Sequence, residues 1–411
     1  MAFLFLCDLS LNIVGYILTK ILMGPSKFTN FIFNRNVQGT FYQAITLSLV
    51  VLGVYYIVQN TAENMMARGL ASGFHFLGVE SQFDIGMTLI EYSPTSTYFD
   101  AFIVGLLNTL LVAGIGIFFA TIVGFAFGIM RLSSNWLIAR IAETYIEVIR
   151  NIPLLLQIFF WYFAVLRALP KPKQSIEFMD SVFLNNRGLF LPDPNFSEGS
   201  SVIFYLFWIT IVISIFIFIW SKRRQNRTGI TFPAFYASLA LVLGVFFAAL
   251  TTTGFPVSFD IPELKGFNYK GGMRLIPELV ALTFALSMYT AAFIAEVVRA
   301  GIMAVSKGQT EAAKSVGLKD GLVLRLIIIP QALRVIVPPL TNQYLNLTKN
   351  SSLAAAIAYP DLVLVFAGTA LMQTGQAIEI IGMVMGVYLF LSLFTSIIMN
   401  LFNRIMRVGE R

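Results

Sequence analysis

The sequence predicts an all-α integral membrane protein with about eight transmembrane helices. Hydrophobic residues make up 57% of the 411-residue chain and charged residues only 12%, whereas a soluble protein carries about 25% charged residues. Apolar stretches of about 20 residues, the length that crosses a bilayer, recur along the chain. Lys and Arg residues gather between alternate stretches, as they do in cytoplasmic loops.

The apolar stretches define the expected spans, which are 40–59, 100–130, 145–168, 202–220, 231–252, 275–298, 335–357 and 377–402. Arg150, Pro153 and Lys349 interrupt the third and seventh of these stretches. With the N-terminus in the cytoplasm, most of the 28 Lys and Arg residues fall on the cytoplasmic side, and Lys222-Arg223-Arg224 is the densest group. The same orientation places 302–334 and the C-terminus in the cytoplasm, and 60–99, 169–201 and 253–273 outside.

The composition also argues against several kinds of chemistry. The chain has one Cys, Cys7, and one His, His75, so a Cys/His metal site, a disulfide framework and a Cys–His nucleophile pair all lack parts. We therefore expect no catalytic residues and no metal site. The basic residues follow the topology of the spans, so we expect no nucleic-acid partner.

The segment 302–334 is a polar, Gly-punctuated loop in an otherwise apolar chain. Ser306 and Gln309 have the spacing of a capping box, which starts a helix. Gly317 can take the left-handed conformation that ends it. Asp320 can begin a second helix, and Pro330 restricts the backbone where the next span begins. Such a loop is either a docking surface for another protein or an ordinary helix that lies on the membrane.

The spacing within this loop carries a family resemblance. Glu311-Ala312-Ala313, Gly317 and then Ile327-Ile328-Ile329-Pro330 resemble the Glu-Ala-Ala loop of ABC importer permeases, with Ile329 where Leu is usual. The flanking segments 289–302 and 330–343 resemble permeases for polar amino acids. Lys349-Asn350-Ser351-Ser352-Leu353 resembles that family's Lys-Asp-Thr-Ser-Leu, and Arg150-Asn151-Ile152-Pro153-Leu154-Leu155 resembles its Arg-Gly-Thr-Pro-Leu-Leu.

The resemblance implies a domain organisation. It covers roughly 98–168 and 275–405, which correspond to a five-helix type I ABC importer permease core. The remainder divides into a cytoplasmic N-terminal extension (1–39), an extra first span with a periplasmic loop (40–97), an insert with two extra spans (169–273) and a cytoplasmic tail (406–411). Within the core, 98–168 is the first part, and 274–405 holds the coupling loop 302–334. An enlarged permease of this kind looks like a membrane subunit of the general L-amino acid importers of bacteria.

The function implied by the resemblance is that of an import permease in the bacterial inner membrane. The residues expected to couple it to a separate ATPase dimer are Glu311, Ala312, Ala313, Gly317 and Pro330. No phosphate-binding loop of the form G-x-x-x-x-G-K-[ST] is present. We therefore expect no enzymatic activity and no bound cofactor, with ATP and Mg on the partner. A second permease subunit, expected to be a different chain, a periplasmic amino-acid-binding protein and membrane lipid are the other expected partners.

An ion-coupled secondary amino acid transporter is the alternative. It would use Glu147, Glu296 and Lys349 as coupling groups and would need no ATPase. A membrane enzyme is a third class, but no nucleophile–base pair or carboxylate dyad supports it.

Ionisable residues inside spans are functional hypotheses, because burying charge in a bilayer is costly. Lys349 shares a helix face with Asn342 and Asn346. This stripe either lines a path for a zwitterion or forms a polar helix–helix interface from which Lys349 reaches outward. Arg150 is a further candidate for the substrate path. It can instead pair with Glu147, three residues earlier, or reach outward at the cytoplasmic end of its span, and either of these structural roles is favoured over a substrate contact. Glu296 and Arg299 have the same spacing and predict a gating or structural pair.

Overall fold

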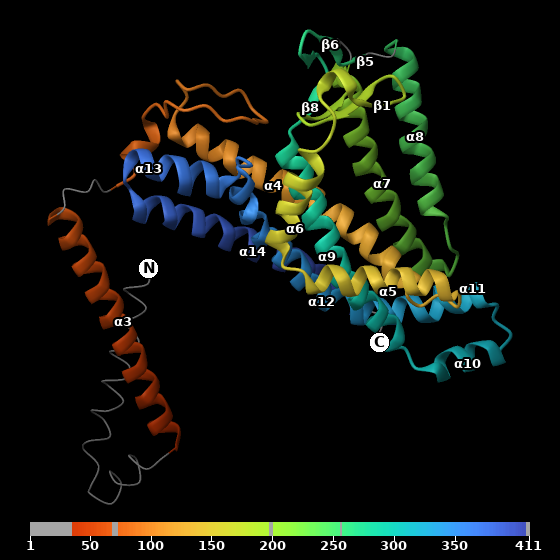
Figure 1. Cartoon of the computed structure of the whole chain (residues 1–411). Helices are drawn as coiled ribbons and strands as arrows, with labels where there is room; N and C mark the ends of the chain where they lie inside the picture. The colour runs from red at the N-terminus through yellow and green to blue at the C-terminus, as the bar shows by residue number, and fades with distance from the viewer. Residues whose placement is uncertain (1–34, 68–72, 197–199, 255–256, 408–411) are drawn as a thin grey trace, which may run out of the picture. The chain divides into compact units, whose positions relative to one another are not determined.

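The computed structural model describes residues 35–67, 73–196, 200–254 and 257–407 (Figure 1). Most of the predicted N-terminal extension, 1–34, and the last four residues of the predicted tail lie outside the described residues. The chain divides into two compact units, 1–73 and 74–411. In the first unit, helix α3 (Arg35–Ala67) contains an apolar segment, Gln38–Thr61, that is long enough to cross a bilayer and includes the predicted first span.

The second unit is built on long apolar helices. They are α4 (Tyr98–Met130), α7 (Ser200–Thr228), α8 (Ala234–Thr252), α9 (Pro277–Met303), α12 (Ile329–Asn350) and α14 (Ala377–Arg407). Together with α3, the described residues contain seven helical segments that can cross a membrane, and a bent pair makes up to eight. The predicted fold class of about eight transmembrane helices is therefore confirmed.

Helices α4 and α9 lie very close to each other at two glycines of α4. A Cβ atom at Gly124 would lie 2.6 Å from the Cβ of Ile294, and one at Gly128 would lie 2.7 Å from the carbonyl oxygen of Ala295. Small residues let helix backbones approach in this way inside a membrane. Gly124 faces Ile294, and Gly128, one turn further along α4, faces Ala295 and Val298 further along α9. The two helices therefore run parallel. More than half of the apolar window of α9 is buried, so α9 lies at the centre of the unit.

The predicted third span, 145–168, is not one straight helix. Helix α5 (Trp136–Asn151) and the helix formed by α6 (Leu154–Phe159) and the π-helical turn η2 (Phe160–Leu166) meet at an angle of 106°. Pro153 causes the break, because its ring disfavours a helical conformation at the preceding residue. Ile152 is indeed extended, with φ −101° and ψ 128°. The side chain of Gln157 donates hydrogen bonds of 2.9 Å to the carbonyl oxygens of Ile149 and Ile152, which the break leaves free.

The predicted seventh span, 335–357, begins too late. Helix α11 (Asp320–Val323) continues through the π-helical turn η4 (Leu324–Ile328) into α12 and the 3₁₀ segment η5 (Ser351–Ile357), so the helical run covers 320–357. Pro330 lies at the start of α12 without a break. Pro330 lies within the continuous run, directly after the π-helical turn η4, whose wider turn accommodates the missing N–H and the proline ring.

A short apolar helix after this span was not predicted. It consists of η6 (Val363–Ala370) and α13 (Leu371–Thr374). Asp361, 1% exposed, begins it by accepting a hydrogen bond of 2.9 Å from the backbone N–H of Leu364. Asn108 of α4 donates to the carbonyl oxygen of Pro360 at 2.8 Å, and Thr109 accepts from the N–H of Leu362 at 3.0 Å. The segment is too short to register as a span.

The segment before α4 is folded against the start of this helix. The 3₁₀ turn η1 (His75–Gly78) places Phe76 against Tyr98, with ring centroids 5.9 Å apart. Thr97 and Asp100 form a capping box at the start of α4. Tyr92 bonds to Ser81 at 2.6 Å, and burial raises the pKa of Tyr92 above its ordinary value.

The described residues between 169 and 275 contain eight short strands that the sequence did not predict. They are β1 (Ile176–Phe178), β2 (Val182–Asn185), β3 (Gly188–Leu191), β4 (Asp193–Phe196), β5 (Val257–Asp260), β6 (Glu263–Lys265), β7 (Asn268–Lys270) and β8 (Met273–Leu275), with the 3₁₀ turn η3 (Pro172–Gln174) before them. They form three antiparallel sheets, ordered β1-β2-β3-β8, β4-β5 and β6-β7. We call 171–196 and 257–275 the cap. The ring of Tyr269 stacks on that of Phe183 at 4.5 Å and lies at a tilt to that of Phe190, 5.1 Å between centroids.

The strand pairing in the cap determines which loops lie at the same end of the second unit. Because β4 pairs with β5, α7 starts and α8 finishes at the cap, and the 229–233 turn between them lies at the opposite end. Helix α9 begins two residues after β8 and leads away from the cap to helix α10 (Lys307–Ser315). The basic turn 221–230 and the loop 302–334 therefore lie at the same end, as the distribution of Lys and Arg predicts.

Replacing Gly128 with alanine tests the α4–α9 contact. The new methyl group would overlap the carbonyl oxygen of Ala295, and overpacking costs about 1–3 kcal/mol. We expect Gly128→Ala to lower the thermal unfolding midpoint of the detergent-solubilised protein. Gly114→Ala is the matched control, because nothing lies within 4 Å of a Cβ there, and it should leave the midpoint unchanged or raise it. Equal midpoints in both variants would contradict a tight contact.

Candidate functional site

Helix α10 begins where the sequence predicts, with Ser306 as its first flanking residue. The backbone N–H of Gln309 donates to the carbonyl oxygen of Ser306 at 3.0 Å. The predicted capping box is wrong, because the Ser306 side chain makes no capping hydrogen bond. The Gln309 side chain instead accepts a hydrogen bond of 3.3 Å from Gln331 of α12. This contact links the start of α10 to the span that follows it.

Gly317 ends α10 in the predicted left-handed conformation, with φ +82°. Its N–H donates to the carbonyl oxygen of Lys314 at 2.9 Å, and the N–H of Leu318 donates to that of Ala313 at 3.2 Å. This pair of bonds is a Schellman motif, which satisfies the last carbonyl groups of a helix. Nothing lies within 4 Å of a Cβ at Gly317, so the requirement for glycine there is conformational rather than steric.

The outer face of α10 is available to a partner. Ala313 is only 6% exposed, whereas Glu311 and Ala312 are exposed and Val316 is 76% exposed. Lys314 forms an ion pair of 2.8 Å with Asp320 across the turn. Among the described residues, Glu311 has no hydrogen bond or ion pair. In Figure 1, α10 extends from the ends of the long helices at the end opposite the cap. Pro330 follows at the start of α12.

A network of ion pairs joins three helices beside this loop. Arg131, at the end of α4, lies 2.8 Å from Glu296 of α9. It also lies 3.6 Å from Glu143 and 4.0 Å from Glu147 of α5. The predicted pair of Glu296 with Arg299 is present at 2.6 Å. Sequence reasoning missed Arg131 as a partner, because 165 residues separate it from Glu296.

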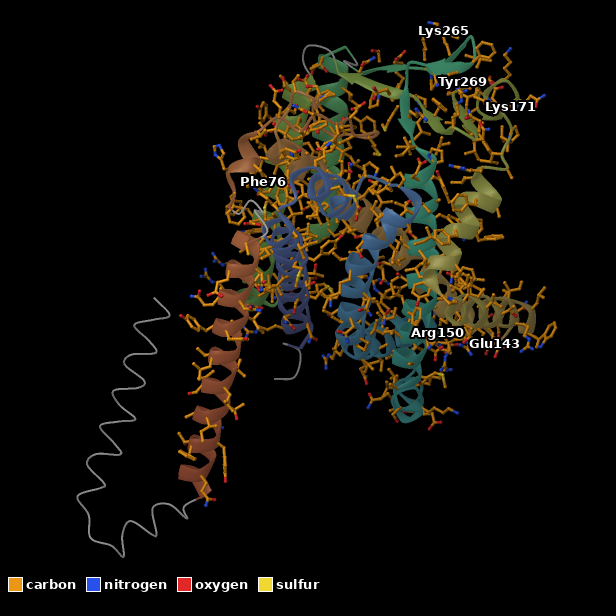
Figure 2. The ribbon with its side chains drawn as sticks, turned by 60° about the vertical axis from the view of Figure 1, so that its left-hand side comes forward. Phe76, Glu143, Arg150, Lys171, Lys265 and Tyr269 are labelled. Atoms are coloured by element: carbon orange, nitrogen blue, oxygen red, sulfur yellow. The ribbon has the colours of Figure 1, made fainter. Side chains whose placement is uncertain are left out.

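The predicted pairing of Arg150 with Glu147 is not observed. The guanidinium of Arg150 lies over the ring of Phe293 of α9, 5.1 Å from its centroid, in a cation–π contact. Glu147 turns instead toward Arg131. Figure 2 shows Arg150 near Glu143 on α5. The described interactions do not connect Arg150 with the polar face of α12.

The polar face of α12 is present as the helical spacing predicts. Asn342, Asn346 and Lys349 are all exposed, whereas Leu347 between them is buried. Leu347 packs against Gly116 near the middle of α4, so Lys349 lies at mid-depth in the helix bundle. Within the described part of the chain, the three polar side chains have no hydrogen-bond or ionic partners. An ammonium group at this depth is costly in hydrocarbon, so this face needs water, a ligand or another polypeptide.

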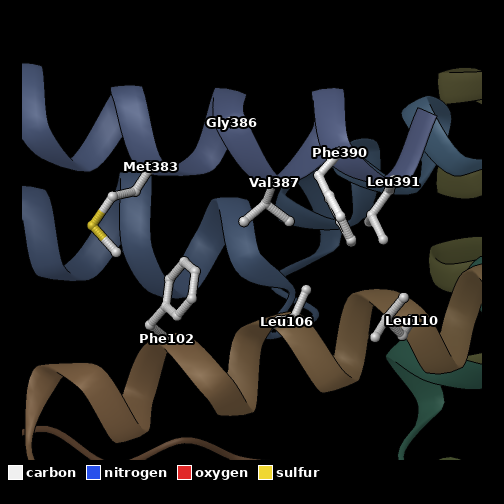
Figure 3. Close-up of a pocket in the computed structure, with 8 residues that line it drawn as sticks. All are labelled: Phe102, Leu106, Leu110, Met383, Gly386, Val387, Phe390 and Leu391. Atoms are coloured by element: carbon white, nitrogen blue, oxygen red, sulfur yellow. The ribbon is translucent and has the colours of Figure 1, made fainter. Parts of the chain in front are cut away.

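An apolar groove of about 330 Å³ lies between α4 and α14 (Figure 3). The eight lining residues are Phe102, Leu106, Leu110, Met383, Gly386, Val387, Phe390 and Leu391. They offer no polar side chain, so the groove suits an apolar surface or a lipid tail rather than a charged solute. The described residues contain no group of three or more His, Cys, Asp or Glu that could hold a metal ion.

The Arg131–Glu296 contact can be tested by a double-mutant cycle. Contacting residues typically show coupling energies of about 0.5–3 kcal/mol. We expect Arg131→Gln and Glu296→Gln each to lower the thermal unfolding midpoint, and the double variant to lose less than the sum. Arg140→Gln is the control. Arg140 pairs with Glu143, but its side chain is 63% exposed. Exposed ion pairs contribute about 0–1 kcal/mol to the free energy of unfolding. Strict additivity would show that the contact contributes nothing.

Comparison with known proteins identifies the family. The model of the family described as "Binding-protein-dependent transport system inner membrane component" matches residues 114–408. The chain is 51% identical over 378 residues to the putative amino-acid ABC transporter permease protein YhdX of Escherichia coli, covering 92% of this chain and 96% of that protein. It is 50% identical to the general L-amino acid transport system permease protein AapQ of Rhizobium johnstonii, covering 94% and 96%.

A third relative is the glutamate/glutamine/aspartate/asparagine transport system permease protein BztB of Rhodobacter capsulatus, 41% identical over 91% of this chain and 96% of that protein. These matches extend over nearly the whole chain, including the cap and the helices α7 and α8. The predicted family resemblance is confirmed: the chain belongs to the family of inner membrane components of binding-protein-dependent transport systems.

Proposed function

We propose that this chain is the membrane permease subunit of an ATP-driven amino acid importer. The observation that carries the proposal is near full-length similarity to proteins named as amino-acid transport permeases, combined with an exposed Glu311 on α10 that has no partner among the described residues. The chain forms a translocation path by alternating access and takes its energy from a separate ATPase dimer, which binds ATP and Mg.

The coupling element in this proposal is the loop around Glu311. Ala312 keeps the exposed side of α10 small, so another backbone can approach closely, and Glu311 supplies a charge contact. Ala313 is buried and holds α10 against the rest of the loop. Gly317 and the Lys314–Asp320 ion pair hold α10 at a fixed angle to α11. Because α11 continues through Pro330 into α12 without a break, a push on α10 reaches a whole span. Glu296 and Arg299 at the same end of α9 are proposed as the gating pair. Arg131 joins Glu296 to α4 and α5.

The substrate path is proposed to follow Asn342, Asn346 and Lys349. Their exposed face needs a polar neighbour, which a second permease subunit and the water-filled space between the two subunits would supply. The Lys349 ammonium would bind the carboxylate of an amino acid. Arg150 stacks on Phe293, so its proposed role is to hold α5 against α9 at the edge of the path.

The proposed orientation places the α10 end in the cytoplasm of a bacterial cell, with both termini there and the cap in the periplasm. Lys222, Arg223 and Arg224 at the α10 end support it, because basic residues favour the cytoplasmic side. A cysteine introduced at Gln225 should resist an impermeant maleimide in intact cells, and labelling there would reverse the orientation. A periplasmic amino-acid-binding protein then delivers the substrate at the cap end.

An ion-coupled secondary transporter is less well supported. Glu296, which that mechanism would use, is bound by two arginines at 2.6 and 2.8 Å. A carboxylate in two charge-assisted hydrogen bonds is stabilised in its ionised form, so it does not suit a group that takes up and releases a coupling ion.

Substitutions at Gly317 and Glu311 test the coupling loop. A non-glycine residue in the left-handed conformation costs about 1–2 kcal/mol, so Gly317→Ala should tilt α10 and reduce copurification of the ATPase and amino acid uptake. Gly321→Ala is the matched control, because Gly321 also has nothing within 4 Å but lies in α11 without a positive φ. Glu311→Ala should weaken ATPase binding, since losing one partner of an interfacial charge pair costs about 2–5 kcal/mol. Wild-type copurification and uptake in both Gly317→Ala and Glu311→Ala would rule out the loop as the coupling element.

A substitution at Lys349 tests the substrate path. Lys349→Met keeps the length of the side chain but removes its charge, so uptake should fall severalfold while the ATPase still copurifies. Lys349→Arg keeps a cation and should retain part of the uptake. The readout is the initial rate of amino acid uptake into proteoliposomes at several substrate concentrations. Unchanged kinetics in Lys349→Met would assign Lys349 a purely structural role.

A further inference from the structure

The helical run 320–357, which carries Lys349, ends at a break inside the helix bundle. The break is the segment 358–362, between η5 and η6. Tyr359 is 0% exposed and Asp361 is 1% exposed, so most of this irregular backbone is covered by protein. The hydrocarbon core of a bilayer has no water to satisfy free backbone groups, so non-helical backbone at this depth depends on partners from other segments.

Asn108, a completely buried residue of α4, supplies such a partner. Its side-chain amide donates a hydrogen bond of 2.8 Å to the carbonyl oxygen of Pro360 and one of 2.9 Å to that of Met87. Both N–H donors of the amide are therefore used, and one side chain joins α4, the break and the segment before α4. The hydroxyl of Tyr359 donates in return to the backbone carbonyl oxygen of Asn108 at 3.2 Å.

The break also lies directly against the backbone of α4. A Cβ atom at Gly105 would lie 3.0 Å from the Cα of Leu362. One turn further along α4, Thr109 accepts a hydrogen bond of 3.0 Å from the backbone N–H of Leu362. After the break, η6 and α13 follow α4 toward its start (Figure 1), where Tyr98 donates to Gln373 at 2.8 Å. The outer end of the helical run is thus held at one point on α4.

The end of the run is fixed in conformation as well as in position. The N–H of Ala358 donates to the carbonyl oxygen of Ala355 at 3.2 Å. The N–H of Tyr359 donates to that of Ala354, also at 3.2 Å. This is the Schellman pattern that also ends α10, but the left-handed residue here is Ala358, with φ +59°, where α10 has Gly317. A left-handed alanine is strained and persists only where its surroundings hold it, as the bonds to α4 do.

The other broken span shows what is particular to Asn108. Gln157 also donates to two carbonyl oxygens that a break leaves free, but these carbonyls belong to its own span, eight and five residues away. Gln157 therefore satisfies groups of the same segment. Asn108 is 252 residues from Pro360 in the sequence, so its hydrogen bond sets where one helix ends relative to another.

We propose that Asn108 is a positioning residue for transport, and that it makes the break 358–362 the fulcrum of the helical run 320–357. The inference rests on the proposed function, in which α10 pushes on the start of this run. A helix that is pushed at one end and held at the other turns about the held end, whereas a helix with two free ends shifts as a whole. Lys349 lies nine residues before Ala358, so it keeps its depth in the bundle while the residues toward α10 move.

Transport stoichiometry tests the role of Asn108 in the permease–ATPase complex, reconstituted in proteoliposomes with its amino-acid-binding protein. The probe is a mixture of radiolabelled L-amino acids. Asn108→Leu keeps the approximate size of the side chain but removes both donors. We expect the number of amino acid molecules taken up per ATP hydrolysed to fall severalfold. A loss of folded complex would lower uptake and hydrolysis together and leave this ratio unchanged, so the ratio separates positioning from stability.

Thr121→Val is the matched control for Asn108→Leu. It removes a hydrogen bond of 2.8 Å between α4 and Tyr344 of α12 without touching the break. Its ratio of uptake to hydrolysis should stay close to that of the wild type. A severalfold loss in both variants would show that any weakened contact between α4 and α12 has this effect, and the special role of Asn108 would be excluded.

Distances between spin labels test the fulcrum without changing Asn108. Cys7→Ser removes the single native cysteine. Phe99→Cys with Ala356→Cys labels the end of the run near the break, and Ile129→Cys with Leu322→Cys labels the end near α10. All four of these labelled residues are exposed. Trapping the ATPase with ATP and vanadate should change the 129–322 distance and leave the 99–356 distance unchanged.

Each contrary result has its own meaning. A 99–356 distance that changes as much as the 129–322 distance would overturn the fulcrum, and so would a constant 129–322 distance while uptake remains ATP-dependent. A wild-type ratio of uptake to hydrolysis in Asn108→Leu would remove Asn108 as the positioning residue. Constant distances together with no ATP-dependent uptake by the wild-type complex would instead refute the proposed function itself.

Discussion

At Gly124 and Gly128, α4 lies so close to α9 that neither position has room for a side chain. The other functional arrangements of the second unit depend on this contact. It holds α9 at the centre, with the cap at its start and α10 shortly after its end. It also brings the end of α4 beside Glu296, so that Arg131 can join α4, α5 and α9 in one ion-pair network. A central helix with a close parallel neighbour can transmit a displacement along its axis, which a loosely packed helix would absorb.

Much of the fold could be predicted from the sequence because bilayer thickness and helical rise set the length of a span. The positions of six spans, the start of α10 and its end at Gly317 depend on local residues, and the structure agrees with them. The errors arise where a local rule competes with another interaction. Pro153 bends the third span, and the bend is tolerated because the freed carbonyl groups find a partner in Gln157. Pro330 does not break the seventh, because the wide turn η4 precedes it.

The candidate site was predictable to the extent that it lies on one helix or one loop. The face formed by Asn342, Asn346 and Lys349 follows from helical spacing alone. Contacts between distant segments carry no such pattern, so Arg131 was missed as the partner of Glu296, and Arg150 was assigned to Glu147 rather than Phe293. The cap was missed for the same reason. Its strands are three or four residues long, and β8 joins a sheet whose other strands lie more than 80 residues earlier.

The pairing of β4 with β5 has a further consequence for how this chain is assembled. Phe196 and Val257 are neighbours in that ladder, so the polypeptide leaves for α7 and returns from α8 at almost the same point. The length of the α7–α8 hairpin does not affect the position of the chain on either side of it, because the pairing of β4 with β5 holds the two ends of the hairpin together. The α7–α8 hairpin can therefore vary or be exchanged as a module, while the strands that close it remain under the constraint of the cap.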